Sequence, residues 1–266
     1  MEIAIAEETQ TQPDDHESSA RKGVVLRKWL LMGEAADGLN FRLFRSKYQD
    51  GDLAFQSPRH HHGFQQIRWA EVGSINYGPE QDIPEGDIAY FPRGTYYGPQ
   101  LKDQGVSLLL QYGFGPELEG ATDPMHRNRD RIRERLAARG EQTDVALEAR
   151  YEIPPEGYAE PILLHPKAFE YYDAAPGVEV KQLGGFYDHS GAAADVRIST
   201  VRLSAEGVHQ LSSERAQIAW STGPGLQIAG MTYPALTCIY SPRDEDVNLT
   251  APGGVELFVV EFPRLD

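Results

Sequence analysis

The segment that decides the fold runs from residue 60 to residue 97 and reads HHHGFQQIRWAEVGSINYGPEQDIPEGDIAYFPRGTYY. On an extended strand, His60 and His62 share one face, and His61 points to the other. Gln66 lies on the face of His62 if no bulge intervenes. Imidazole nitrogen is a good ligand for zinc, iron, copper and nickel. This pattern predicts a metal position, whereas the preceding Ser57-Pro58-Arg59 leaves open a surface loop cluster of histidines.

The spacing of the segment resembles the two motifs of the cupin superfamily (RmlC-like). Those motifs read G-x5-H-x-H-x3,4-E-x6-G and G-x5-P-x-G-x2-H-x3-N. The positions that match them are His60, His62, Gly73, Gly86, Pro92 and Gly94. Gln66 takes the glutamate position and Tyr97 takes the histidine position, so two of the four usual metal ligands are changed.

The resemblance implies an all-β fold and one divalent transition metal ion, which could be Fe, Zn, Mn, Ni or Cu. It assigns His60 and His62 as metal ligands, with Gln66 as a third ligand through its amide oxygen. The alternative for Gln66 is a structural hydrogen bond in the barrel, because its counterpart Gln217 recurs where both histidines are absent. Tyr97 is expected to be a catalytic neighbour of the metal or its fourth ligand.

An internal repeat supports a duplicated barrel independently of the motifs. The matching segments are 66–69 with 217–220, 90–93 with 240–243, and 105–108 with 254–257, at offsets of 151, 150 and 149 residues. A repeat of this length indicates a duplicated domain rather than a solenoid. The predicted fold is two cupin barrels (double-stranded β-helix, or jelly roll) in tandem, a bicupin. Leu211, Ser213 and Val247 fall at the duplicate site positions, which predicts a metal in the first barrel only.

The predicted domain organisation has four parts. Residues 1–22 are acidic and are expected to be a disordered tail. Residues 23–122 form the N-terminal barrel with the metal site. Residues 123–159 are read as a helical insertion and linker, because Asp123-Pro124 suits a helix start. Residues 160–266 form the C-terminal, degenerate barrel.

Charge and composition restrict the partners of the chain. The 266 residues carry a net charge of −15, which opposes binding to nucleic acid or to anionic membranes. One cysteine excludes a disulfide framework. No apolar run reaches the length of a membrane span, and the acidic start is unlike a secretory signal, so a cytoplasmic protein is expected. A homodimer is also expected, because partners commonly cover the sheet edges of such barrels.

Arg68 lies two residues beyond Gln66 and has two interpretations. As a catalytic residue it would point into the cavity and hold a carboxylate or enolate bidentately. The favoured alternative is a partly exposed strand residue in an ion pair. We expect a metal-dependent cupin enzyme for a small organic molecule, with dioxygenase-like oxidoreductase chemistry. The alternatives are a non-catalytic small-molecule-binding cupin and a cupin isomerase, cyclase or lyase.

Overall fold

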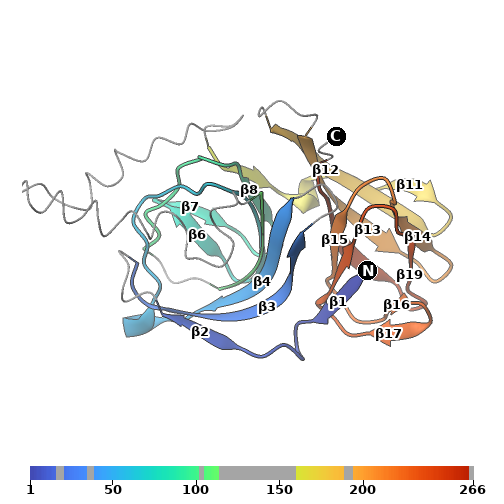
Figure 1. Cartoon of the computed structure of the whole chain (residues 1–266), viewed down its shortest axis with the longest axis horizontal. Coiled ribbons are helices and arrows are strands. Elements are labelled where there is room, and N and C mark those ends of the chain that lie inside the picture. The colour runs from blue at the N-terminus through green and yellow to red at the C-terminus, as the bar shows by residue number, and fades with distance from the viewer. Residues whose placement is uncertain (16–20, 35–38, 102–104, 114–159, 189–193, 264–266) are drawn as a thin grey trace, which may run out of the picture. The chain divides into compact units, whose positions relative to one another are not determined.

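A computed structural model describes residues 1–15, 21–34, 39–101, 105–113, 160–188 and 194–263 (Figure 1). These residues form β-strands and two short 3-10 turns, η1 (Gly51–Leu53) and η3 (Pro166–Ala168), which confirms the all-β prediction. The helical insertion and linker expected over 123–159 lie outside the described residues. Across the described ranges there is no helix long and apolar enough to cross a membrane.

The chain divides into two compact units. Unit 2 contains Thr11–Arg27 and Arg45–Leu163, and unit 1 contains the remaining ranges, Met1–Gln10, Lys28–Phe44 and Leu164–Asp266. The boundary therefore differs from the predicted division at residues 122 and 160, because residues 1–10 and 28–44 group with the second half of the chain. The boundary between the units falls within two strands, β3 (Val24–Glu34) and β4 (Asn40–Tyr48).

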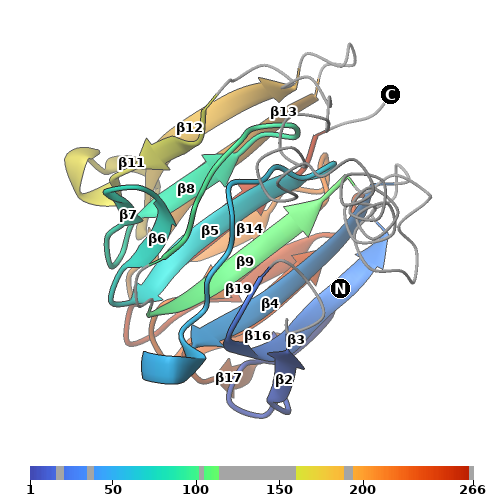
Figure 2. The ribbon, with the colours of Figure 1, turned by 90° about the vertical axis from the view of Figure 1, so that its left-hand side faces the viewer.

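Unit 2 is built on a seven-stranded sheet, supplemented by a hairpin. The order of the sheet is β10 (Ile162–Leu164), β8 (Ile88–Phe91), β5 (Gln65–Val72), β9 (Val106–Tyr112), β4 (Asn40–Tyr48), β3 (Val24–Glu34) and β2 (Gln12–Asp15). The hairpin joins β6 (Ile75–Gly78) to β7 (Gln81–Ile83). Figure 2 shows β8, β5, β9 and β4 side by side. Every residue of β9 is buried, as its apolar sequence predicts for an inner wall.

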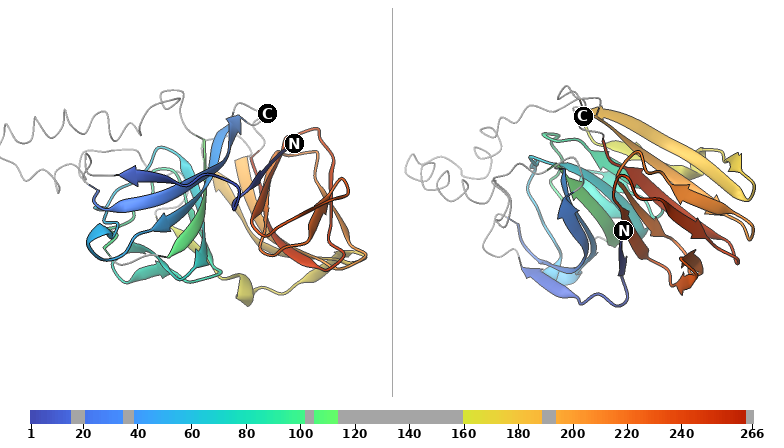
Figure 3. Two further views of the ribbon diagram at one scale, coloured as in Figure 1. Left: turned by 90° about the horizontal axis from the view of Figure 1, so that it is seen from below. Right: turned by 45° about the vertical axis from the view of Figure 1, so that its right-hand side comes forward.

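Unit 1 has a seven-stranded and a four-stranded sheet, which curve around a common interior (Figure 3). The larger sheet runs β1 (Glu2–Ile5), β18 (Thr237–Ser241), β15 (Gln217–Ser221), β20 (Val255–Glu261), β13 (Ala194–Leu203), β12 (Val178–Asp188) and β11 (Tyr172–Ala175). The smaller sheet runs β14 (Val208–Leu211), β19 (Val247–Thr250), β16 (Leu226–Ile228) and β17 (Met231–Tyr233).

The strand register repeats between the units, as the sequence repeat predicts. β5 lies between β8 and β9, and β15 lies between β18 and β20. Trp69 and Trp220 have equivalent neighbours on both sides, namely Ile88 and Leu108 for the first, and Cys238 and Phe258 for the second. Each partner in unit 1 is therefore 150 residues beyond its counterpart in unit 2.

The expected disorder of the N-terminal tail is wrong for most of that stretch. Glu2–Ile5 forms β1, which pairs antiparallel with β18, and Gln12–Asp15 forms β2, which pairs with β3. The stretch is acidic in composition, but it includes the apolar residue Ile3. The side chain of Ile3 packs against the buried apolar cluster of unit 1. An amphipathic strand of this kind protects the exposed edge of a sheet.

Replacing Ile3 by Asp should therefore destabilise unit 1. The change removes apolar burial and places a charge against the core, and we expect a loss of about 1–2 kcal/mol in the free energy of unfolding. Glu2→Gln, at an exposed position of the same strand, is the matched control. Urea unfolding measures both variants, and equal midpoints for the two would contradict the role given to β1.

Candidate functional site

Backbone hydrogen bonds hold the two motifs against each other. The N–H of His60 donates to the carbonyl of Tyr97, the N–H of Tyr97 donates back to His60, and both distances are 2.9 Å. The N–H of Gly94 donates to the carbonyl of His62, also at 2.9 Å. The histidines were expected on a strand, but β5 begins only at Gln65, and His60 makes an isolated bridge. The proline at position 58 has no N–H to continue a ladder.

The predicted sidedness of the histidines is nevertheless observed. The rings of His60 and His62 lie 4.9 Å apart, and the ring of His60 lies 4.3 Å from that of Tyr97. His61 packs elsewhere, 4.5 Å from the ring of Tyr96. His60 is 4% exposed and His62 is 9% exposed, so the interpretation of a surface loop cluster is wrong.

His60 is held in one tautomer. Its Nδ1 lies 2.7 Å from the carbonyl oxygen of Pro58, and because a carbonyl only accepts, Nδ1 carries the hydrogen. The lone pair of the neutral ring is then on Nε2. Burial, followed by the positive charge of Arg21 and the neighbouring His62, holds the pKa of His60 well below its ordinary value of 6.5.

This lowered pKa predicts acid sensitivity. The folded protein keeps His60 neutral, whereas the unfolded chain binds a proton below about pH 6.5, so stability falls as the pH is lowered through that value. The contribution of His60 is about 1.4 kcal/mol per pH unit below it. In His60→Gln, urea unfolding between about pH 5 and 7 should show a shallower pH dependence than in wild type. Burial also lowers the pKa of His209, but this residue is unchanged in His60→Gln and so does not contribute to the difference between the variant and wild type. A pH dependence of His60→Gln equal to that of wild type would contradict this account of His60.

A buried phenol joins the histidines to Arg68. Arg68 Nη2 lies 2.8 Å from Tyr97 Oη and donates to it. Tyr97 Oη lies 2.8 Å from His62 Nε2, and its own hydrogen is directed there because the guanidinium has no acceptor. The guanidinium also lies over two aromatic rings, 4.8 Å from the centre of Phe91 and 4.9 Å from that of Tyr97.

Gln66 directs its oxygen at the same guanidinium. Arg68 Nε and Nη2 both lie 3.1 Å from one polar atom of the Gln66 amide, and since a guanidinium only donates, that atom is the oxygen. The amide nitrogen of Gln66 then faces the side-chain amide of Gln111 at 2.8 Å and donates to it, so Gln111 presents its oxygen there. Gln66 is therefore positioned by Gln111 on β9 and accepts from Arg68.

Arg68 is 5% exposed, so its interpretation as a partly exposed strand residue in an ion pair is wrong. Its Nη1 is buried, and among the described residues it has no hydrogen-bond partner. No carboxylate of those residues forms an ion pair with this guanidinium. A buried cation without a counter-charge is costly unless a ligand compensates for it.

The comparisons with known proteins identify the fold. No family model matches the chain, and no curated protein matches it. Its solved structural relatives include oxalate decarboxylase from Bacillus subtilis at pH 4.6, with a TM-score of 0.60 and 13% identity over 98% of this chain and 75% of that one. The chain has the cupin fold.

Two further solved structures are also similar to this chain. One, on the substrate binding mode and a reaction specificity switch in oxalate decarboxylase, has a TM-score of 0.60 and 13% identity over 98% of this chain and 76% of that one. The other concerns the Mn(II) centres of the Bacillus subtilis enzyme, with a TM-score of 0.57 and 14% identity over 98% of this chain and 76% of that one. At identities this low, the structural similarity establishes only the cupin fold, and the function has to be argued from the residues of the site.

A divalent metal, which the cupin fold suggests, does not fit the contacts of this site. Within the described ranges there is no cluster of three or more His, Cys, Asp or Glu side chains that could hold an ion. The oxygens of Gln66 and Tyr97 both accept from Arg68, and a guanidinium would repel a neighbouring metal cation. These contacts oppose ligation through the oxygens of Gln66 and Tyr97, and metal ligation by His60, His62 and Gln66 stays a prediction.

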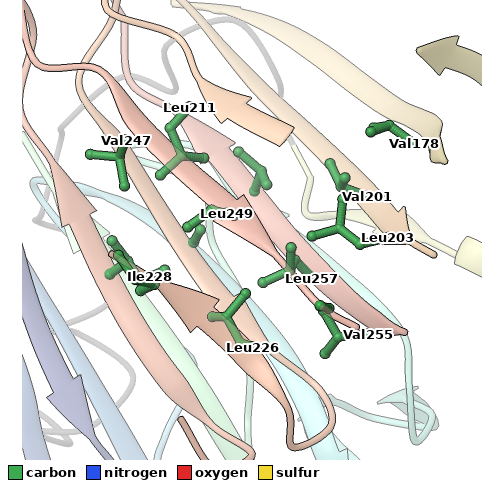
Figure 4. Close-up of a cluster of buried hydrophobic side chains, with 14 residues drawn as sticks. Val178, Val201, Leu203, Leu211, Leu226, Ile228, Val247, Leu249, Val255 and Leu257 are labelled. Atoms are coloured by element: carbon green, nitrogen blue, oxygen red, sulfur yellow. The ribbon is translucent and has the colours of Figure 1, made fainter. Parts of the chain in front are cut away.

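The equivalent place in unit 1 is apolar. Leu211 pairs with Val247 across β14 and β19, which repeats the bridge between His60 and Tyr97. Figure 4 shows Leu211 and Val247 among the side chains of a cluster formed only by buried apolar residues. Leucine and valine supply no ligand atom, so unit 1 cannot repeat the chemistry of unit 2 at this position.

Gln111 is the residue of the site that the sequence analysis missed. Its neighbours on β9 are largely aliphatic, so the sequence of this strand by itself indicates an apolar wall. A polar amide near the end of such a strand, opposite Gln66 in the register, was the available signal. A buried amide must be hydrogen-bonded, which makes a polar partner across the sheet a natural inference.

Proposed function

We propose that unit 2 is a small-molecule cupin barrel that binds an organic acid, with Arg68 receiving the carboxylate. The observation that carries this proposal is the buried Nη1 of Arg68, which lacks a hydrogen-bond partner among the described residues. A carboxylate supplies both the missing acceptor and the missing counter-charge. Hydrogen bonds to charged groups contribute about 1.5–3 kcal/mol each.

The occupied atoms of the guanidinium define how the acid binds. Nε and Nη2 already donate to Gln66, and Nη2 also donates to Tyr97, so the usual bidentate edge is in use. The carboxylate is therefore received by Nη1, which has two hydrogens available. This differs from the bidentate clamp expected from sequence, and it favours a small, compact acid.

The comparison with solved structures supports the same class of ligand. Oxalate decarboxylase acts, by its name, on a small dicarboxylate, and its structure covers 98% of this chain. We therefore choose oxalate, malonate and acetate as probes and acetamide as the neutral control. Calorimetric titration of the wild-type protein should show saturable binding of at least one acid and none of acetamide. Binding of acetamide as tight as that of the acids, or no binding of any acid, would contradict the proposal.

A metal-dependent enzyme is the second candidate. It is favoured by the Nε2 lone pair of His60, which the hydrogen bond between Nδ1 and Pro58 leaves available, and by the nearby ring of His62, whose centre lies 4.9 Å from that of His60. The dioxygenase-like reaction and the isomerase, cyclase and lyase alternatives stay predictions. Metal analysis of protein purified without a His tag tests this candidate, since one tightly held transition metal per chain would support it.

The repeated register also supports a tandem pair of cupin barrels. We retain this bicupin arrangement, the cytoplasmic location and the homodimer as proposals.

A further inference from the structure

We propose that the guanidinium of Arg68 serves as the cationic centre of unit 2 in place of a divalent metal ion. The inference rests on the proposed carboxylate-binding function and names the group that supplies its positive charge. Three observations support it, namely the hydrogen-bond partners of Arg68, the charges around Arg68, and the residues at the equivalent positions of the repeat.

The two changed motif positions both serve Arg68. Gln66, in place of glutamate, accepts from Nε and Nη2 at 3.1 Å, and Tyr97, in place of histidine, accepts from Nη2 at 2.8 Å. A glutamate at the first position would neutralise the guanidinium. An amide and a phenol orient it and leave its charge available to a ligand. One role, which is to hold the side chain of Arg68, therefore explains both departures from the metal motif.

The charges near the site also oppose a metal. Burial lowers the pKa of Arg27, Asp14 and Tyr48 raise it, and the smaller effects of Arg21 and Arg68 lower it again. Asp14 is the ion-pair partner of Arg27 and does not pair with Arg68. Several positive groups thus act on this part of unit 2, and a divalent cation would add to their repulsion, whereas an anion would relieve it.

The second half of the chain provides an internal comparison. At the position of Arg68 the repeat has Ala219, and at the position of Tyr97 it has Val247. Gln217 keeps the position of Gln66, but its amide nitrogen donates to the backbone carbonyl of Ser212. The arginine and its phenol are therefore absent together, as expected if they form one functional set.

The test converts the arginine centre into a metal centre. Wild type, Gln66→Glu, and the double variant Gln66→Glu/Arg68→Met are titrated with Mn²⁺, with the free ion followed by its paramagnetic resonance signal. Wild type should bind none, because the oxygens of Gln66 and Tyr97 accept from Arg68, whose charge repels a cation. Gln66→Glu should also bind none, because its new carboxylate pairs with Arg68. The double variant frees that carboxylate beside two imidazoles and should bind about one ion per chain. Adding His62→Asn to the double variant should abolish this binding.

Circular dichroism and thermal unfolding establish whether each variant is folded. If the double variant does not fold, the titration of wild type with Mn²⁺ still tests the inference. Tight binding of Mn²⁺ by wild type, or by Gln66→Glu as tightly as by a folded double variant, would overturn the inference. A folded double variant that binds no Mn²⁺ would also overturn it. The Mn²⁺ titrations contain no carboxylate ligand. A result that overturns this inference is therefore distinct from a failure of organic acids to bind wild type, which would overturn the proposed function.

Discussion

Replacing Arg68 by Met is expected to weaken carboxylate binding by about 10- to 100-fold while leaving the unfolding temperature of the ligand-free protein equal to or above that of wild type. Methionine retains the unbranched aliphatic part of the side chain but removes a buried charge that has no carboxylate partner among the described residues. The lost hydrogen bonds to Gln66 and Tyr97 offset part of that gain. Calorimetry with the tightest-binding acid, together with thermal unfolding, measures both effects.

Arg45→Met is the matched control for this result. Arg45 forms a two-point ion pair with Glu71, with distances of 2.6 and 2.7 Å, in the same unit. Its loss should lower stability and leave acid binding unchanged. If Arg68→Met instead destabilises the protein as an ordinary broken ion pair does, and acid affinity is kept, Arg68 has a structural role and the proposed function is wrong.

Replacing Leu249 by Ala should cost about 2–5 kcal/mol in the free energy of unfolding, because its side chain is completely buried in the apolar cluster of unit 1 (Figure 4). The deletion leaves a cavity that the surrounding strands can close only partly. Urea unfolding measures the loss. Below the unfolding transition the affinity for organic acids should remain that of wild type, because Ala219 stands in unit 1 at the position equivalent to Arg68.

Val208→Ala is the control for the Leu249 variant. Val208 is 53% exposed on the neighbouring strand β14, so its truncation should change stability by only a few tenths of a kcal/mol. A loss of acid binding in folded Leu249→Ala protein, with binding kept in Val208→Ala, would show that the interior of unit 1 contributes to the ligand site.

The architecture was predictable because local patterns of apolar and polar residues indicate its strands. The apolar run 106–112 and the alternating residues of β4 specify strands, and the repeat around Trp69 and Trp220 specifies their equivalent registers. The first strand was not predicted, because the acidic composition of the N-terminal stretch outweighed the short alternation that includes Ile3. Whether such a strand forms depends on an available sheet edge, and local sequence does not contain that information.

The proximity of the predicted site residues was easier to predict than the contacts between them. His60, His62, Gln66, Arg68 and Tyr97 are brought together, directly or through the phenol, as their motif positions suggest. Sequence could not show which of them contacts which. The decisive facts are the direction of the Gln66 oxygen and the absence of a carboxylate partner for Arg68 in the described part of the chain, and both depend on side chains from several strands.

The most direct test of metal-free acid binding is a calorimetric titration of wild-type protein with its tightest organic acid, with and without excess 1,10-phenanthroline. This chelator is neutral and carries no carboxylate, so it does not compete for a guanidinium. We expect the same affinity and the same stoichiometry in both titrations. Loss of binding with the chelator, and its recovery when Mn²⁺ or another divalent metal is restored, would contradict the account and identify a metal as the centre of the site.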